Sequence, residues 1–267
     1  MESRIDRCAG CGLEWQVTSE AFGLEQYRGN LYREQIGERA DALHYFDRHD
    51  HEQFEKLLRV RGLLPRGGVV ADVGCGGGSF LDFVKGVAGR TIAIEPAEAY
   101  HESLRSRGHD VFPTCDRVSG PLADLVTSFS VIEHVEHPVE FARSIRSLLK
   151  PGGWAVLSTP NRADVMLRDG PAEYKSFFYR QVHLFYFDAS SLRETLSRAG
   201  YVDIRVEFMH RFGFGNYGGW MRDRRPPGDV AGPLEPPFDD IWRATLESQG
   251  VSDYLYVAAR NPERASA

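Results

Sequence analysis

The stretch from Val69 to Phe80, VVADVGCGGGSF, runs from apolar residues through an acidic residue into four glycines that surround a cysteine. Such a run is typical of a buried strand that ends in a tight turn before a helix. One glycine is enough for a turn, whereas four indicate that a ligand approaches the bare backbone closely. In a parallel sheet this turn lies at the carboxyl edge, where ligands bind.

The residues that follow alternate between short apolar segments and segments with helical spacing. The apolar segments are TIAIEP, DVFPTC, ADLVTSFSV and GWAVLSTPN. This alternation predicts an α/β protein with a Rossmann-like, doubly wound, mostly parallel sheet. Two more strands are expected at 201–209 and 252–260, after a helix capped by Ser190 or Ser191 and by Gly200. Between them, the Gly- and Pro-rich segment 211–238 is expected to be a long loop.

The first 60 residues differ from the rest and are predicted to form a helical leader, with residues 61–267 as the main domain. The helical spacing is carried by a set of apolar residues, namely Leu43, Phe46, Phe54, Leu57 and Leu58.

Cys8 and Cys11 have the C-x-x-C spacing of a zinc knuckle. Tetrahedral zinc needs four ligands. Of the other two cysteines, Cys75 lies in the glycine turn and Cys115 ends a strand, so we interpret the pair as a remnant knuckle without metal.

The composition limits the classes of partner. The chain has 267 residues, is 42% hydrophobic and carries a net charge of −6, which supports a real core and disfavours non-specific binding to nucleic acid or anionic membranes. The sequence contains no pattern of a signal peptide and no apolar run long enough to span a bilayer. We therefore expect a cytoplasmic protein with a small-molecule partner; the oligomeric state is not indicated.

The acidic residues at the ends of two strands define the ligand. Asp72, two residues before the first glycine, would repel the pyrophosphate of a dinucleotide but suits an ammonium group, which disfavours an NAD(P)-linked oxidoreductase. Glu95 ends the second strand, where a carboxylate can accept hydrogen bonds from both ribose hydroxyls. A cationic amino acid joined to a nucleoside is S-adenosylmethionine.

At these residues the chain resembles the class I S-adenosylmethionine-dependent methyltransferases, in particular the ubiquinone-biosynthesis-like and natural-product-tailoring branch. The matching blocks are ADVGCGGGSF, AIEP, VTSFSVIEHVEHP, LLKPGGWAVLSTPN and HLFYFDASSLRETLSRAGY. The resemblance implies a seven-stranded sheet whose last strand is antiparallel, with the cofactor over the first two strands.

The resemblance also implies roles for individual residues. Asp72, Gly74 and Gly76 would line the methionine portion of the cofactor. Glu95 and Pro96 would hold the ribose, and Asp116 or its neighbours would approach the adenine. Ser128, Phe129 and Ser130 would close the site after the fourth strand.

Transfer to a hydroxyl group requires a proton acceptor, and a histidine suits that role at neutral pH. His134 beside Glu133 is one candidate and His183 is the other. Some related methyltransferases bind a divalent ion through Glu-x-x-Glu-His and a later histidine. Here Ser130 replaces the first glutamate, so no metal ion is expected.

These observations predict a small-molecule methyltransferase that acts on an oxygen of a hydroxylated secondary metabolite, sugar or quinone precursor. Aromatic residues in 174–187 and 208–220 are expected to form an apolar lid on the acceptor side. Nitrogen and carbon acceptors remain open. The alternatives are a catalytically inactive S-adenosylmethionine-binding protein and an RNA methyltransferase.

Overall fold

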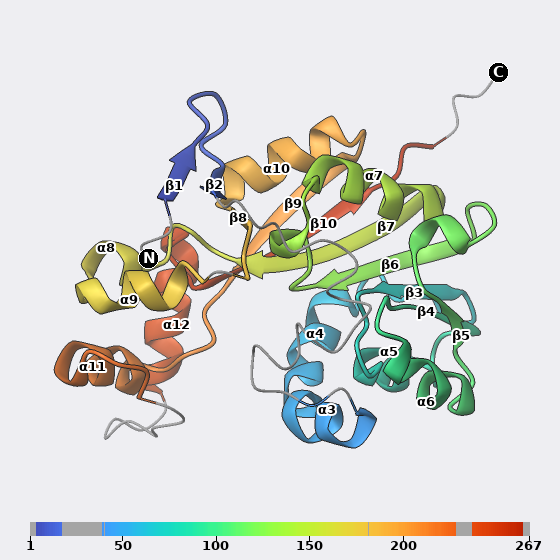
Figure 1. Cartoon of the computed structure of the whole chain (residues 1–267), viewed down its shortest axis with the longest axis horizontal. Helices are drawn as coiled ribbons and strands as arrows, with labels where there is room; N and C mark the ends of the chain where they lie inside the picture. The colour runs from blue at the N-terminus through green and yellow to red at the C-terminus, as the bar shows by residue number, and fades with distance from the viewer. Residues whose placement is uncertain (1–3, 18–38, 40, 181, 228–236, 264–267) are drawn as a thin grey trace.

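The computed structural model describes residues 4–17, 39, 41–180, 182–227 and 237–263 (Figure 1). Its centre is a seven-stranded sheet with the order β5-β4-β3-β6-β7-β10-β9. The strands are β3 (Val69–Val73), β4 (Arg90–Ile94), β5 (Asp110–Phe112), β6 (Ala123–Phe129), β7 (Leu149–Pro160), β9 (Val202–Met209) and β10 (Tyr254–Arg260). Strands β3 to β7 pair in parallel, and β10 is antiparallel to both of its neighbours. The predicted sheet, including its antiparallel last strand, is confirmed.

Helices cover both faces of this sheet. Helices α7 (Pro138–Leu148) and α10 (Ala189–Arg198) pack on one face through a buried apolar cluster. The other face is covered by α4 (Gln53–Val60), α5 (Ser79–Val84) and α6 (His101–Ser106), with α3 (Ala42–His49) preceding α4. Figure 1 shows the two groups on opposite sides of the strands. The first strands are therefore buried on both faces, which explains their nearly continuous apolar sequence.

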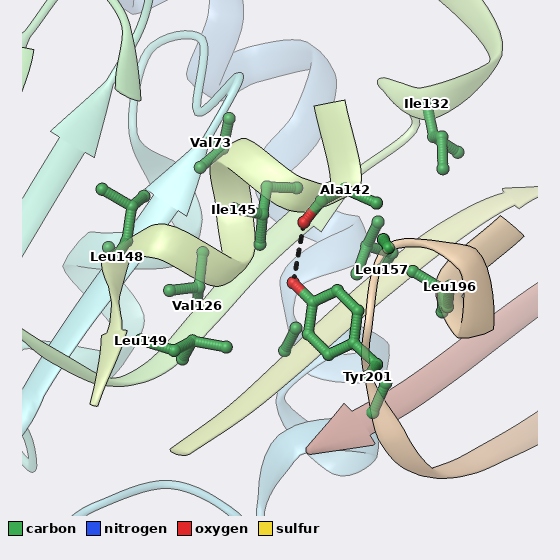
Figure 2. Packing of buried hydrophobic residues seen from close by; sticks show 14 of the residues in the cluster. Val73, Val126, Ile132, Ala142, Ile145, Leu148, Leu149, Leu157, Leu196 and Tyr201 are labelled. Carbon is green, nitrogen blue, oxygen red and sulfur yellow. Dashed lines mark hydrogen bonds between the residues drawn. The ribbon is translucent and has the colours of Figure 1, made fainter. Parts of the chain in front are cut away.

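One face of the core is seen from close by in Figure 2. Ile145 and Leu148 of α7 pack against Leu149 and Leu157 of the sheet. The Tyr201 hydroxyl donates a hydrogen bond to the Ala142 carbonyl oxygen over 3.1 Å. The tyrosine thus buries its ring without leaving its polar atom unpaired.

A second, smaller layer lies beyond the carboxyl ends of β6 and β7. It contains α8 (Val165–Asp169), α9 (Ala172–Phe178), α11 (Phe214–Asp223) and α12 (Phe238–Gln249), which share an apolar cluster of their own. The prediction of a long loop over 211–238 is wrong for the residues of α11. Residues 228–236 of that prediction lie outside the described residues. The Gly-rich sequence still forms a helix because Trp220 is buried against Tyr174 in this cluster.

The N-terminal segment is only partly helical. Strands β1 (Arg4–Arg7) and β2 (Glu14–Val17) form a hairpin, and β2 also pairs with β8 (Phe185–Tyr186). The predicted helical leader is therefore wrong for the hairpin and right for α3 and α4. The division at residue 60 stays a prediction.

Two further details differ from the sequence-based expectation. Helix α10 is capped by Asp188 rather than by a serine, and Ser191 completes a capping box with it. In the N-terminal helices, Leu43 and Phe54 are 79% and 63% exposed. The apolar spacing in this segment therefore did not identify its buried face. Among the described residues, no helix is long and apolar enough to cross a membrane.

The central position of Leu157 gives a test of the core. Leu157 is 1% exposed in β7, whereas Leu43 is 79% exposed. We expect Leu157→Ala to lower the free energy of unfolding by about 2–5 kcal/mol, because it removes buried methyl groups and leaves a cavity. Leu43→Ala makes the same chemical change and is expected to cost less than about 0.5 kcal/mol. Urea denaturation of both variants measures the difference, and equal effects would contradict the packing.

Candidate functional site

A cavity of about 490 Å³ opens at the carboxyl ends of β3, β4 and β6. Its walls come from these strand ends, from the turn after β6 and from the N-terminal helices. The sequence-predicted residues that line it are Gly74, Glu95, Pro96, Asp116, Phe129, Ser130 and His134. Asp72, Gly76, Ser128, Glu133 and His183 are not among its lining residues. The expected ligand edge of the sheet is thus also the place of the cavity.

The glycine turn after β3 is fixed by its backbone conformation. Gly74 and Gly76 have φ angles of +76° and +54°, which residues with a Cβ rarely adopt. The Gly74 N–H donates to the Ile94 carbonyl oxygen over 2.7 Å. A Cβ at Gly76 would overlap the ring of Tyr45, which packs over the turn. The turn therefore needs glycine both for its shape and for the close approach of its neighbours.

Glu95 holds this turn to the end of β4. Its Oε2 accepts a hydrogen bond from the Gly76 N–H over 2.7 Å, and its Oε1 accepts one from the Ala97 N–H over 2.9 Å. The side chain is buried but lines the cavity beside Pro96. The carboxylate is thus oriented by two backbone groups at the edge of the cavity.

Asp72 lies deeper, beneath the turn. Burial raises the pKa of its carboxyl group to about 7, although the hydrogen bond from Thr127 and the charge of Lys56 oppose the rise. The Thr127 hydroxyl donates to Asp72 Oδ1 over 2.7 Å. Ser128 is also internal, and its hydroxyl donates to the Val73 carbonyl oxygen over 2.9 Å. These two residues support the turn from below.

One wall of the cavity was not predicted from the sequence. It is formed by side chains of α3, the following single turn and α4, namely Tyr45, His49, Glu52 and Lys56. Their spacing of four, three and four residues is helical, so a search for polar and aromatic residues on one helix face would have found them. Lys56 is the only lysine or arginine among the lining residues. Among the described lining residues, it is therefore the only side chain that brings an ammonium or guanidinium group to the cavity.

Glu52 and Lys56 form a polar pair on this wall. The Lys56 ammonium group donates to Glu52 Oε2 over 3.1 Å. Burial raises the pKa of Glu52, but the hydrogen bond from His49 and the charge of Lys56 outweigh it and lower the pKa to about 2. Glu52 therefore stays ionised at neutral pH. Lys56 also lies 5.4 Å from the centre of the Phe129 ring.

Glu133, His134 and His183 lie close together, and His134 is the one of the three that lines the cavity. One ligand atom from each lies within 4.8 Å of the others. His134 Nδ1 is 2.8 Å from the Val182 carbonyl oxygen, which requires the proton on Nδ1 and leaves Nε2 as an acceptor. Nε2 is 4.0 Å from Glu133 Oε1. The two histidine rings contact edge to face, with centres 4.8 Å apart.

Burial sets the protonation of this cluster. It lowers the pKa of His134 to about 4 and holds that of His183 well below its ordinary value, so both rings are neutral at pH 7. It raises the pKa of Glu133 to about 7. Glu133 Oε2 has no hydrogen-bond partner in the described structure. The cluster can therefore accept a proton or contribute two imidazole nitrogens and a carboxylate oxygen to a metal ion.

Ser130 occupies the position of the first glutamate in the metal-binding pattern Glu-x-x-Glu-His. Its φ angle is +57°, and its hydroxyl is hydrogen-bonded to the Tyr254 hydroxyl. The serine is thus engaged with β10.

Comparison with known proteins identifies the chain's relatives. Residues 45–206 match the family model described as "Methyltransferase domain". A probable S-adenosylmethionine-dependent methyltransferase of Mycolicibacterium smegmatis is 32% identical over 69% of the chain and 72% of that protein. The ubiquinone biosynthesis O-methyltransferase of Thiobacillus denitrificans is 32% identical over 39% of the chain and 51% of that protein.

More distant similarities also exist. A tRNA (carboxymethyluridine(34)-5-O)-methyltransferase of Mus musculus is 27% identical over 53% of the chain and 21% of that protein. Among solved structures, phosphoethanolamine N-methyltransferase 2 of Haemonchus contortus superposes with a TM-score of 0.60 at 16% identity, over 94% of this chain and 62% of that chain. At this identity the likeness concerns the fold.

The raised pKa of Glu133 leads to a test by stability. The folded protein holds the proton of Glu133 up to about pH 7, whereas the unfolded chain releases it near pH 4.5. Stability should therefore fall as pH rises from about 4.5 to 7, by at most on the order of 3 kcal/mol from this group. Glu133→Gln should lack this part of the pH dependence, and the exposed control Glu140→Gln should keep it. Parallel profiles of wild type and Glu133→Gln would contradict the assignment.

Proposed function

The chain belongs to the methyltransferase-domain family and is an S-adenosylmethionine-dependent methyltransferase, and on this basis we propose that it methylates an oxygen of a hydroxylated small molecule. The acceptor class is a secondary metabolite, sugar or quinone precursor. The observation that carries the proposal is the neutral His134 in the wall of the donor cavity, with Nε2 as a proton acceptor. A hydroxyl acceptor needs such a group, whereas an amine is already nucleophilic.

The cavity suits the methyl donor. S-adenosylmethionine supplies both the methyl group and the leaving group, so the protein has to bind, align and exclude water. We assign the ribose to Glu95 and Pro96, and the methionine portion to the turn at Gly74 and Gly76, with Asp72 beneath it. Asp116 is assigned to the adenine portion.

Two further assignments complete the donor site. Lys56, the lining cation, suits the carboxylate of the methionine portion. Phe129 and Ser130 close the site after β6, with Ser128 behind them as support.

Proton transfer is assigned to His134, with Glu133 as its partner. When Nε2 takes the proton of the acceptor, a buried imidazolium forms, and its burial alone makes that unfavourable. The Glu133 carboxylate, 4.0 Å away, offsets this cost when it is ionised. Because burial raises the pKa of Glu133 to about 7, activity is expected to rise with pH through this range.

A metal-assisted mechanism is the second candidate, because the ligand atoms of Glu133, His134 and His183 lie within 4.8 Å of one another. Two neutral imidazoles and a carboxylate fit zinc or another divalent transition metal. When bound, such an ion lowers the pKa of a coordinated hydroxyl group. His183 then acts as a ligand, whereas in the first mechanism it contacts His134 through its ring.

The proposal of a small acceptor rests on the cavity of about 490 Å³ and on charge. A net charge of −6 disfavours attraction to a polyanion. RNA is thus the less favoured class of acceptor and is kept as an alternative. The alternative to catalysis is an inactive S-adenosylmethionine-binding protein.

Donor binding tests the ribose site. We expect Glu95→Gln to weaken the binding of S-adenosylhomocysteine by about 1.5–3 kcal/mol, because the amide loses charge-assisted hydrogen bonds. Glu98→Gln, an exposed neighbour three residues along, should leave the affinity unchanged. Isothermal titration calorimetry measures both. Unchanged affinity in Glu95→Gln would move the ribose elsewhere.

Single-turnover assays on a panel of phenols, catechols and sugars test the base. We expect His134→Gln to slow methyl transfer by about 10²–10⁴-fold with the donor affinity preserved. The exposed His137→Gln is the matched control. The metal mechanism would be favoured instead if a chelator removes the activity, a divalent ion restores it, and both His134→Gln and His183→Gln are inactive. Full activity in His134→Gln would exclude His134 from both the general-base and the metal-assisted mechanism.

A further inference from the structure

A second cavity, of about 370 Å³, lies between the N-terminal hairpin and helices α8 and α9. Its lining comes from the hairpin, the helical layer and the turn after β7. The lining residues are Ile5 and Arg7 of β1, Glu14 of β2, Arg162 of the turn, and Leu167, Lys175 and Tyr179 of the helical layer. None of these residues lines the donor cavity. Its volume is within the range of small-molecule sites.

Positive charge dominates this cavity. Three of its lining side chains are cationic, namely Arg7, Arg162 and Lys175, and one is acidic, Glu14. A Cβ on Gly12 would lie 3.4 Å from Arg7 Nη2 and 3.6 Å from Arg162 Nη2, so the two guanidinium groups approach the same point. Like charges held this close destabilise the protein unless an anion lies between or beside them.

Among the described residues, acidic side chains pair with one of the three cations, Arg162. Arg162 Nη1 donates to Glu14 Oε1 over 3.2 Å, and Arg162 Nη2 donates to Asp188. Glu14 also accepts the Tyr179 hydroxyl over 2.9 Å. Within the described ranges, neither Arg7 nor Lys175 forms an ion pair or a side-chain hydrogen bond, and the buried Nε of Arg162 lacks an acceptor. In the described part of the chain, Arg7 of β1 and Lys175 of α9 thus remain unpaired, and Arg162 keeps one unpaired nitrogen, Nε.

From this arrangement we propose that the cavity binds the phosphate group of a small phosphate monoester. A phosphate dianion offers three strong acceptor oxygens to Arg7, Lys175 and Arg162, whereas a carboxylate has one charge and two oxygens. Ile5, Leu167 and the Tyr179 ring provide an apolar wall for the body of the ligand. This site is separate from the donor cavity and does not rest on the proposed methyl acceptor.

Calorimetry on the full chain tests the site with phenyl phosphate as the probe, and with benzoate and phenol as comparisons. We expect phenyl phosphate to bind at least tenfold more tightly than benzoate, and phenol not to bind. Arg7→Gln and Lys175→Gln should each lower the affinity for phenyl phosphate by about tenfold or more, because each removes a charge-assisted hydrogen bond. Arg4→Gln is the matched control, since Arg4 is on the same strand, 75% exposed and paired with Asp6.

Unchanged S-adenosylhomocysteine affinity in every variant verifies that the fold is intact and separates this test from the proposed function. The proposal is overturned if phenyl phosphate does not bind at millimolar concentration, or if its affinity survives both substitutions. Equal affinity for benzoate would also overturn it. Binding of a single-stranded RNA oligonucleotide through Arg7 and Lys175, with phenyl phosphate rejected, would assign the surface to nucleic acid instead.

Discussion

The two hydrogen bonds that the Glu95 carboxylate accepts from Gly76 and Ala97 hold the site together. They join the turn after β3 to the end of β4, and Gly74 of this turn lines the cavity. A carboxylate in this place also supplies the charge that a ribose hydroxyl pair prefers. The same bonds therefore shape the turn and orient the Glu95 carboxylate at the cavity. Glycine is required next to them because the Tyr45 ring already fills the space of a Cβ.

Burial acts on the site's acids and bases in opposite directions. It raises the pKa values of Asp72 and Glu133 to about 7 and lowers that of His134 to about 4. Both effects favour the uncharged form, because an apolar surrounding disfavours any isolated charge. An ammonium group near Asp72, or a proton arriving at His134, would favour ionisation of the neighbouring carboxyl group. The ionisation of Asp72, Glu133 and His134 therefore depends on the charge of the groups beside them.

The sequence predicted the sheet well because each buried strand reads as a short apolar run between helical segments. It also placed Glu95 and His134 on one edge, since the carboxyl ends of parallel strands meet there. The helices α8, α9 and α11 were not predicted, because their stability comes from packing around Trp220 rather than from local propensity. Tyr45 and its helix face were missed for a related reason. Apolar spacing identifies a buried face, and here the face toward the cavity is polar and aromatic.

Backbone hydrogen bonds link the N-terminal hairpin to the cluster of Glu133, His134 and His183. The Gln16 N–H donates to the Leu184 carbonyl oxygen over 2.9 Å, and the Leu184 N–H donates to the Glu133 carbonyl oxygen over 2.8 Å. This backbone path runs from β2 through Leu184 to Glu133, which with His134 and His183 forms the base cluster. A displacement of the hairpin would therefore shift the segment that holds His183 and the carbonyl of Val182, which fixes the proton on His134. Because Arg7 and Glu14 belong to the same hairpin, an anion in the second cavity would stabilise the support on which the base cluster depends.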